Sequence, residues 1–236
     1  MLTEAAYEQL FPNRNTLFTY QGLVTAAATF PAFVSEGTGD QRRRELAAFL
    51  ANIGHETTGG WPTAPGGAQA WGLHFKQEVG CEGGACTGYC QPGDAKYPCA
   101  PGKTYHGRGP IQLSYNYNYG ACGDALGVDL LSDPDLVTSS PEITFRTALW
   151  FWMTPQAPKP SAHAVMTGGY QPSPSDLAAG RVEGFGLTID IINGGVECGY
   201  PSPPQVKDRV AFYEKFCQVL GVDPGPAREC AEMESF

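Results

Sequence analysis

The clearest pattern in the chain is an apolar stripe over residues 41–55. Leu46, Leu50 and Ile53 recur at helical spacing after a polar, basic first turn. This spacing predicts an amphipathic helix. Glu56 follows Ile53 by three residues, so the helical period carries its carboxyl group onto the apolar face.

Six further stretches have helical spacing or helix-forming composition. They are residues 3–10, 20–30, 115–126, 141–153, 187–192 and 206–220. The stretch 141–153 is apolar nearly all round, which is typical of a helix buried at the axis of a domain.

Residues 59–110 predict a long loop, because Gly and Pro interrupt the sequence every few residues. Strand signals are short and confined to this region. A loop of this length inside a compact domain usually carries function. The pattern as a whole predicts a mainly α protein (α+β class) with a small β element, in two lobes around a deep cleft.

Length and charge narrow the class of protein. The chain has 236 residues and a formal net charge of −9, so it is not steered toward nucleic acid, anionic lipid or the anionic peptidoglycan of bacterial walls. No run of about 18 apolar residues suggests a membrane span. Residues 2–8 are polar and lack the basic stretch and apolar core of a signal peptide.

Eight cysteines are many for a chain of this size. Four of them crowd into residues 81–99, none forms a CxxC motif, and the four histidines show no ligand spacing near them. Disulfides in an oxidising compartment therefore fit better than a zinc site. We expect a secreted protein without a metal or cofactor.

Two glutamates are candidates for acid–base chemistry. Glu56 lies where an apolar helix gives way to a glycine turn, a partly desolvated place that suits a general acid, although a glutamate that only caps the helix fits equally well. Glu78 has cationic and polar neighbours such as Lys76, and alone it is more typical of a surface residue. Together the two match the pair of carboxylates that glycoside hydrolysis requires.

Residues 106–119 combine glycines with amides, a hydroxyl group and aromatic rings. Amides and hydroxyl groups hydrogen-bond to sugar hydroxyl and N-acetyl groups, and aromatic faces stack on sugar rings. A glycine-rich turn before a tyrosine-rich packing helix would have much the same composition.

This segment resembles the signature of the family 19 glycoside hydrolases, the plant-type chitinases of classes I, II and IV. The resemblance covers most of the chain, from about residue 10 to Cys230. Its other landmarks are residues 48–51, 55–61, 70–72, 148–153 and 191–199. It implies a bilobal, lysozyme-like fold that hydrolyses β-1,4-linked N-acetylglucosamine with inversion. We expect residues 1–236 to be one catalytic domain without a separate chitin-binding module.

The resemblance also implies roles for single residues. Glu56 is the acid and Glu78 the base, and Ser114 helps Glu78 hold the attacking water. Glu197 and Arg209 are coupled to the acid, and Thr58 lies near the base. The positions that match sugar-contacting residues are Tyr105, Gln112, Asn118, Lys159 and Asn193. Trp61 and Trp71 match family tryptophans that contact substrate or pack the loop, and Tyr97 replaces a family tryptophan, which weakens stacking there.

The cysteine pairs Cys90–Cys99 and Cys198–Cys230 match disulfides of the family. Cys81 and Cys86 are additional and are close enough in sequence to pair, whereas Cys122 and Cys217 match no family pair.

The sequence therefore predicts a monomeric inverting endochitinase that acts on chitin and N-acetylglucosamine oligosaccharides. It would bind neither nucleic acid nor membranes. Two alternatives stay open at this point. A lysin that cleaves peptidoglycan would share the fold, and a chitin-binding protein without catalysis would need neither glutamate.

Overall fold

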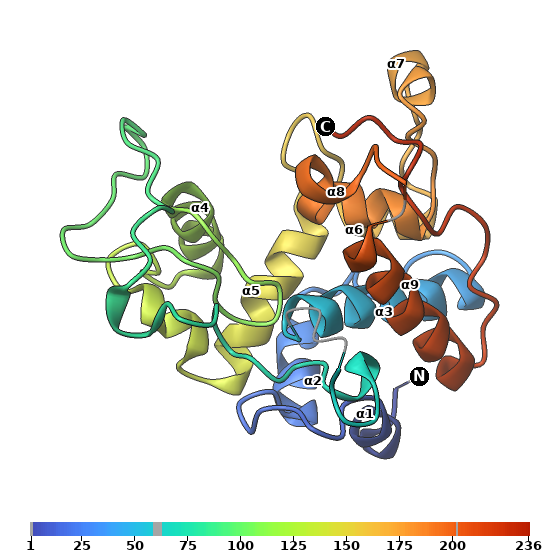
Figure 1. Ribbon diagram of the computed structural model, residues 1–236, viewed down its shortest axis with the longest axis horizontal. Coiled ribbons are helices and arrows are strands. Elements are labelled where there is room, and N and C mark those ends of the chain that lie inside the picture. Colours follow the sequence, from blue (N-terminus) through green and yellow to red (C-terminus); the bar gives the residue numbers. More distant parts are fainter. Residues whose placement is uncertain (1, 59–62, 202) are drawn as a thin grey trace.

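The computed structural model describes residues 2–58, 63–201 and 203–236 (Figure 1). Helices make up most of its regular structure. The α-helices are α1 Glu4–Leu10, α2 Tyr20–Ala28, α3 Gly39–Glu56, α4 Asn116–Leu126, α5 Pro141–Met153, α6 Ala162–Thr167, α7 Pro174–Ala178, α8 Phe185–Glu197 and α9 Pro204–Leu220. Short 3₁₀ helices are η1 Ala68–Ala70, η2 Glu82–Gly84 and η3 Pro134–Thr138.

Helix α3 is the central helix of the fold and ends at Glu56. It begins with a capping box. The Gln41 backbone N–H donates to the Thr38 hydroxyl oxygen, and the Thr38 backbone N–H donates to the Gln41 side-chain oxygen. Every residue of α3 from Glu45 to His55 is buried. The helix therefore forms part of the core, and this fixes the position of its last residue, Glu56, whose side chain is partly exposed.

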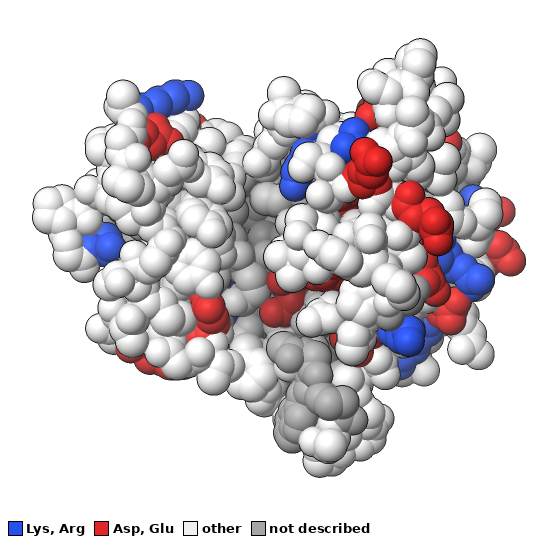
Figure 2. Space-filling model, turned by 45° about the horizontal axis from the view of Figure 1, so that its top comes forward, with Lys and Arg blue, Asp and Glu red and all other residues white. Residues whose placement is uncertain are grey.

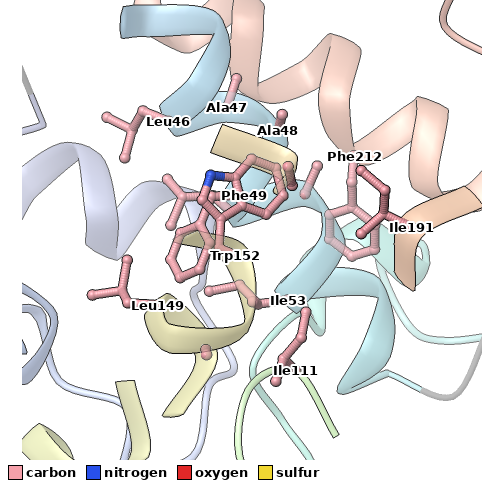
Figure 3. Close-up of a cluster of buried hydrophobic side chains, with 14 of the residues drawn as sticks. Leu46, Ala47, Ala48, Phe49, Ile53, Ile111, Leu149, Trp152, Ile191 and Phe212 are labelled. Carbon is pink, nitrogen blue, oxygen red and sulfur yellow. The ribbon is translucent and has the colours of Figure 1, made fainter. Parts of the chain in front are cut away.

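The core joins α3 to the helices on either side of it (Figure 3). Phe49 of α3 meets the Trp152 ring of α5 edge-on, with centroids 5.6 Å apart. On the other side, α9 approaches α3 so closely that a Cβ atom on Gly54 would lie 3.1 Å from the Phe212 ring. These contacts fix the position of α3 against both neighbours.

Helix α8 is longer than the sequence predicts. It was expected over residues 187–192, but it begins after Gly184 and runs to Glu197. Asn193 interrupts it with non-helical dihedrals, φ −145° and ψ 31°. The glycines that follow Asn193 disfavour a helix locally. Glu197, at the end of the helix, is nevertheless buried and bonded to Arg209.

Figure 1 shows two lobes with α5 running between them. One lobe holds α4 and the loops around it, and the other holds α3, α6, α8 and α9. No strand occurs in the described ranges. The expected β element is reduced to isolated bridges, among them Gln77–Arg108 and Arg108–Leu113. The mainly α, bilobal architecture is confirmed.

Three disulfides are present, and they confirm the predicted pairs. Cys81–Cys86 and Cys90–Cys99 fasten the long loop, and Cys198–Cys230 ties the end of α8 to the last described segment. Cys122 and Cys217 are buried free thiols. Within the described ranges, no helix has both the length and the apolar character needed to cross a membrane.

Candidate active site

A cleft of about 680 Å³ lies between the two lobes. Figure 2 shows this face of the molecule hollowed, with acidic side chains at the hollow. Glu56 enters from one lobe and Glu78 from the other, and both line the cleft. Gln112, Ser114 and Asn118 line it on the side of Glu78. The structure thus brings together the two glutamates, which are 22 residues apart in sequence.

Glu56 is the partly exposed end of a buried helix. Its side chain is 17% exposed, and its Oε1 accepts a hydrogen bond from Arg209 Nη2. Glu56 also lines a second cavity of about 710 Å³, together with His55, Gln69 and Asp208. Glu56 therefore borders two cavities.

Arg209 links Glu56 to Glu197 in the interior. Its guanidinium is fully buried, with Nε 2.8 Å from Glu197 Oε2 and Nη2 2.7 Å from Glu197 Oε1. Nη1 donates to Asn52 Oδ1 over 3.1 Å. Burial alone would raise the pKa of Glu197, but the Arg209 charge and hydrogen bonds, with a further bond from Asn193, lower it overall. Glu197 is therefore an ionised partner of Arg209.

Glu78 has a different set of partners. Its Oε1 accepts a hydrogen bond of 2.8 Å from the Tyr89 hydroxyl group, and its Oε2 faces the Gly107 backbone N–H at 3.4 Å. The Glu78 backbone N–H donates to the Gly107 carbonyl oxygen over 2.8 Å. These bonds hold the carboxylate toward the cleft from the loop that carries it.

Tyr89 is a site residue that the sequence analysis missed. It lines the cleft, and burial followed by the nearby Glu78 carboxylate raises the pKa of its hydroxyl group to about 12. The hydroxyl group therefore stays protonated and donates across the working range of pH. Nothing in the local sequence marks Tyr89, and only its position before Cys90 in the tied loop sets it apart.

The predicted segment around Ser114 forms the floor beside Glu78. The Ser114 hydroxyl group donates to the Gln112 carbonyl oxygen over 2.9 Å, and Asn118 Nδ2 donates to the Ser114 carbonyl oxygen over 2.9 Å. Gln112 has a positive φ of 50° and its Nε2 bonds to Gly109. The segment is therefore a rigid turn whose polar atoms border the cleft.

Asn193 and Lys159, two of the predicted sugar-contacting residues, line the opposite wall. Asn193 is exposed, and its Nδ2 donates to Glu197 Oε1 over 2.8 Å. Lys159 is half-buried, and its Nζ donates to the Ile191 carbonyl oxygen over 2.8 Å. Burial lowers the pKa of Lys159, and nearby Asp190 opposes this effect.

Two tyrosines expected at the cleft lie elsewhere. Tyr105 is 1% exposed, and its hydroxyl group donates to the Leu131 carbonyl oxygen over 2.8 Å. Tyr97 packs against Gly120 on one side, has the Lys96 ammonium 4.7 Å from its ring centroid, and donates to Asp124. The structure therefore brings neither ring to the cleft surface.

The remaining predicted residues pack the loop after α3. Thr58 is buried, and its hydroxyl group donates to the His55 carbonyl oxygen over 3.1 Å. Trp71 donates from Nε1 to the Pro65 carbonyl oxygen over 2.8 Å and lies edge-on to His74. Trp61 lies outside the described residues.

One group of potential metal ligands occurs in the described part of the chain. It consists of Glu78, Cys81 and Cys86. The two sulfur atoms are joined in a disulfide, so neither is the thiolate that would bind a metal ion.

Two carboxylates that enter one cleft from opposite lobes define a site of the glycoside hydrolase class. Comparison with known families agrees with this class. The family described as chitinase class I (Glyco_hydro_19) matches residues 2–230, and the chain belongs to this family of chitin-cleaving enzymes.

Plant chitinases are among its similar relatives. A basic 30 kDa endochitinase from Solanum lycopersicum is 55% identical over 223 residues, which are 94% of this chain and 68% of the relative. Chitinase 9 from Oryza sativa subsp. japonica is 51% identical and covers 100% of this chain and 71% of its own length. An endochitinase from Carica papaya is 49% identical over 100% of this chain and 98% of its own.

Solved structures of the family share the fold. Chitinase C from Streptomyces griseus HUT6037 matches 97% of this chain and 79% of its own with a TM-score of 0.79 at 39% identity. A class IV chitinase from Zea mays matches 97% of each chain with a TM-score of 0.75 at 32% identity. The expected lysozyme-like fold is therefore confirmed.

Proposed function

We propose that this chitinase cleaves internal β-1,4 linkages of chitin and N-acetylglucosamine oligosaccharides with inversion at C1. Glu56 gives its proton to the glycosidic oxygen as the bond to C1 breaks. A water molecule attacks C1 from the opposite face, and Glu78 takes the proton that this water loses. The observation that carries the proposal is that Glu56 and Glu78 face one cleft from opposite lobes with different hydrogen-bond partners.

The partners of Glu56 suit a group that gives up a proton. Once the proton has moved to the sugar oxygen, the Glu56 carboxylate is held by the buried Arg209. Glu197 accepts two hydrogen bonds from the same guanidinium. Part of the positive charge of Arg209 is therefore balanced by Glu197 before the reaction. Arg209 and Glu197 therefore act as positioning residues for the acid.

The hydrogen-bond partners of Glu78 suit a group that accepts a proton. The Tyr89 hydroxyl group and the Gly107 N–H orient its carboxylate. Ser114 borders the same part of the cleft and has hydroxyl lone pairs that can accept a hydrogen bond from water. A water molecule between Ser114 and Glu78 would be held for attack.

Two substitutions test the roles of the glutamates. Glu56→Gln should remove turnover of chitin hexamer while oligomer binding is retained, and Glu78→Gln should lower kcat by about 10²-fold or more with little change in KM. Circular dichroism checks that both variants fold. Activity within tenfold of the parent protein for Glu56→Gln, or a change in KM alone for Glu78→Gln, would contradict these roles.

A second assay separates chitin from peptidoglycan as substrate. Chitin oligomers and bacterial walls are offered to the same preparation, and we expect turnover of the oligomers alone. The net charge of −9 is unfavourable for an anionic wall. Faster release of wall fragments than of chitin products would favour the lysin alternative.

We further propose that the protein works as a secreted monomeric catalytic domain. Three disulfides support an oxidising compartment. Fractionation of the native source, combined with light scattering of the purified protein, tests compartment and oligomeric state. A cytosolic location with reduced cysteines would overturn the proposed secretion, and a stable dimer would overturn the proposed monomeric state.

A further inference from the structure

We propose that Phe236 is a sugar-contacting residue at the rim of the cleft, held in place by Arg181, and that it makes binding favour long oligomers. The inference rests on the proposed chitinase function. It concerns a residue that the acid–base mechanism does not use and that no motif in the sequence singles out.

The segment that carries Phe236 is fastened at several points. The disulfide Cys198–Cys230 ties its start to the end of α8. Further along, the Glu234 N–H donates to the Ala179 carbonyl oxygen over 2.9 Å. Gly180, with a φ of 72°, allows a close approach, because a Cβ atom there would lie 2.4 Å from the Glu232 carbonyl oxygen. The segment is therefore docked against the turn after α7.

Arg181 holds the last residues of this segment directly. Its Nε donates to the Glu234 carbonyl oxygen and its Nη2 to the Ser235 carbonyl oxygen, each over 2.9 Å. Its guanidinium carbon lies 4.2 Å from the centroid of the Phe236 ring, the geometry of a cation–π contact. One side chain thus fixes both the backbone before Phe236 and the ring itself.

Two carboxylates fix Arg181 in turn. Nη1 lies 3.2 Å from Asp176 Oδ1. Nε is 3.9 Å from Oδ2 of Asp190, which is fully buried. Neither side-chain oxygen of Asp190 has a hydrogen-bond partner in the described part of the chain. Burial raises the pKa of Asp190, and the charges of Lys159 and Arg181 oppose this rise. Arg181 is therefore held by the direct contact with Asp176, with the buried Asp190 carboxylate close behind it.

The ring of Phe236 is half-buried and forms part of the cleft lining, with Lys159, Ile192 and Asn193. Arg181 lies against the ring, and Phe236 also borders the cleft. An aromatic ring beside polar residues such as Asn193 and Lys159 offers an apolar surface to the C–H face of a sugar. The alternative is that the ring only packs against the core, which it also contacts.

The place of Phe236 along the cleft predicts its effect. In Figure 1 the end of the chain marked C lies beside α8 and well apart from the end of α3, where Glu56 stands. Sugars next to the scissile bond lie closest to Glu56, which protonates that bond in the proposed mechanism. The proposal places Phe236 in contact with sugars further along the oligomer, so it should contribute to affinity only for longer chains.

The kinetic test compares the parent protein with Phe236→Ala and Phe236→Leu on the tetramer and hexamer of N-acetylglucosamine. We expect KM for the hexamer to rise about three- to tenfold, more than kcat falls, while KM for the tetramer changes less. Leucine keeps apolar bulk but removes the ring face, so it should resemble alanine. An unchanged ratio of hexamer to tetramer KM in both variants would overturn the proposal.

A second measurement excludes a role in folding alone. A single 4-fluorophenylalanine at position 236, in the non-cleaving Glu56→Gln background, should shift its ¹⁹F signal on titration with hexamer more than with tetramer. Arg181→Met should weaken the length preference in the kinetic test. Tyr200→Ala, which removes an exposed ring outside the cleft lining, should leave it unchanged. A fluorine signal that does not respond to the hexamer would show that the ring only packs.

The outcomes also separate this inference from the proposed function. If the parent protein does not cleave chitin oligomers, the proposed function fails. If the parent cleaves them but the Phe236 variants keep its length preference, only the present inference fails.

Discussion

Arg209 binds the carboxylate of Glu56 from a fully buried position next to the second cavity. The same guanidinium also binds Glu197, so one cation serves two carboxylates. Removing one partner of a buried ion pair leaves an uncompensated charge and is strongly destabilising. This arrangement therefore couples the position of the acid to the stability of the fold.

The first prediction concerns the loss of that cation. Arg209→Met should lower the free energy of unfolding at neutral pH by about 3–5 kcal/mol, because Glu197 is left buried without its partner. Urea unfolding followed by fluorescence measures the change. The matched control is Arg228→Met, whose pair with Glu214 is exposed and contributes at most about 1 kcal/mol. Equal effects of the two substitutions would contradict the buried pair as a stabilising element.

The second prediction concerns pH. Because the native pKa of Glu197 is lowered, its ionised form stabilises the fold above its unfolded-state pKa. That stability is lost as the pH falls through the lower native pKa. Glu197→Gln should therefore destabilise the protein at pH 7 and have a smaller effect in strong acid. Thermal unfolding of the parent protein and of Glu197→Gln from pH 7 to strong acid tests the sign of the effect. A difference in stability that grows as the pH falls would refute it.

The third prediction concerns Tyr89, whose hydroxyl group donates to Glu78. Tyr89→Phe should lower kcat on chitin hexamer about tenfold with little change in KM, because a hydrogen bond to the base is lost without loss of the ring. Tyr20→Phe is a suitable control, since it removes a hydroxyl bond to Leu2 far from the cleft lining. A kcat equal to that of the control would show that Tyr89 does not orient the base.

The fourth prediction ranks two disulfides. Replacing Cys198 and Cys230 by serine opens a link across 32 positions and should cost about 3–4 kcal/mol. The same change at Cys81 and Cys86, across 5 positions, should cost about 2 kcal/mol. Peptide mapping without reduction confirms the pairs, and denaturant unfolding compares the variants. The reverse order of stability would contradict the loop-length argument.

Much of the fold follows from local patterns in the sequence. The helix that ends at Glu56 was predictable because its apolar stripe matches its buried face. Helix α5 was predictable with the right bounds because Ser140 caps it and Pro141 occupies its first turn. Helices α6 and α7 were missed, because six and five residues are too few for a periodic pattern.

The rest of the site depends on contacts that are distant in sequence. Tyr89 reaches Glu78 and Phe236 reaches the cleft only because loops fold back and are tied there. Composition alone does not show which of many tyrosines faces the cleft. Tyr105 illustrates the converse, since a residue that matches a sugar-contacting position is buried with its hydroxyl group bonded to Leu131.

The most direct test of the acid–base assignment of Glu56 and Glu78 is the anomer that is released first. Chitin hexamer is cleaved in an NMR tube, and the anomeric proton signals of the new reducing ends are followed before they mutarotate. Attack by a water molecule held by Glu78, opposite the bond that Glu56 protonates, predicts that the α-anomer forms first from the β-linked substrate. Initial formation of the β-anomer would show retention and contradict the account.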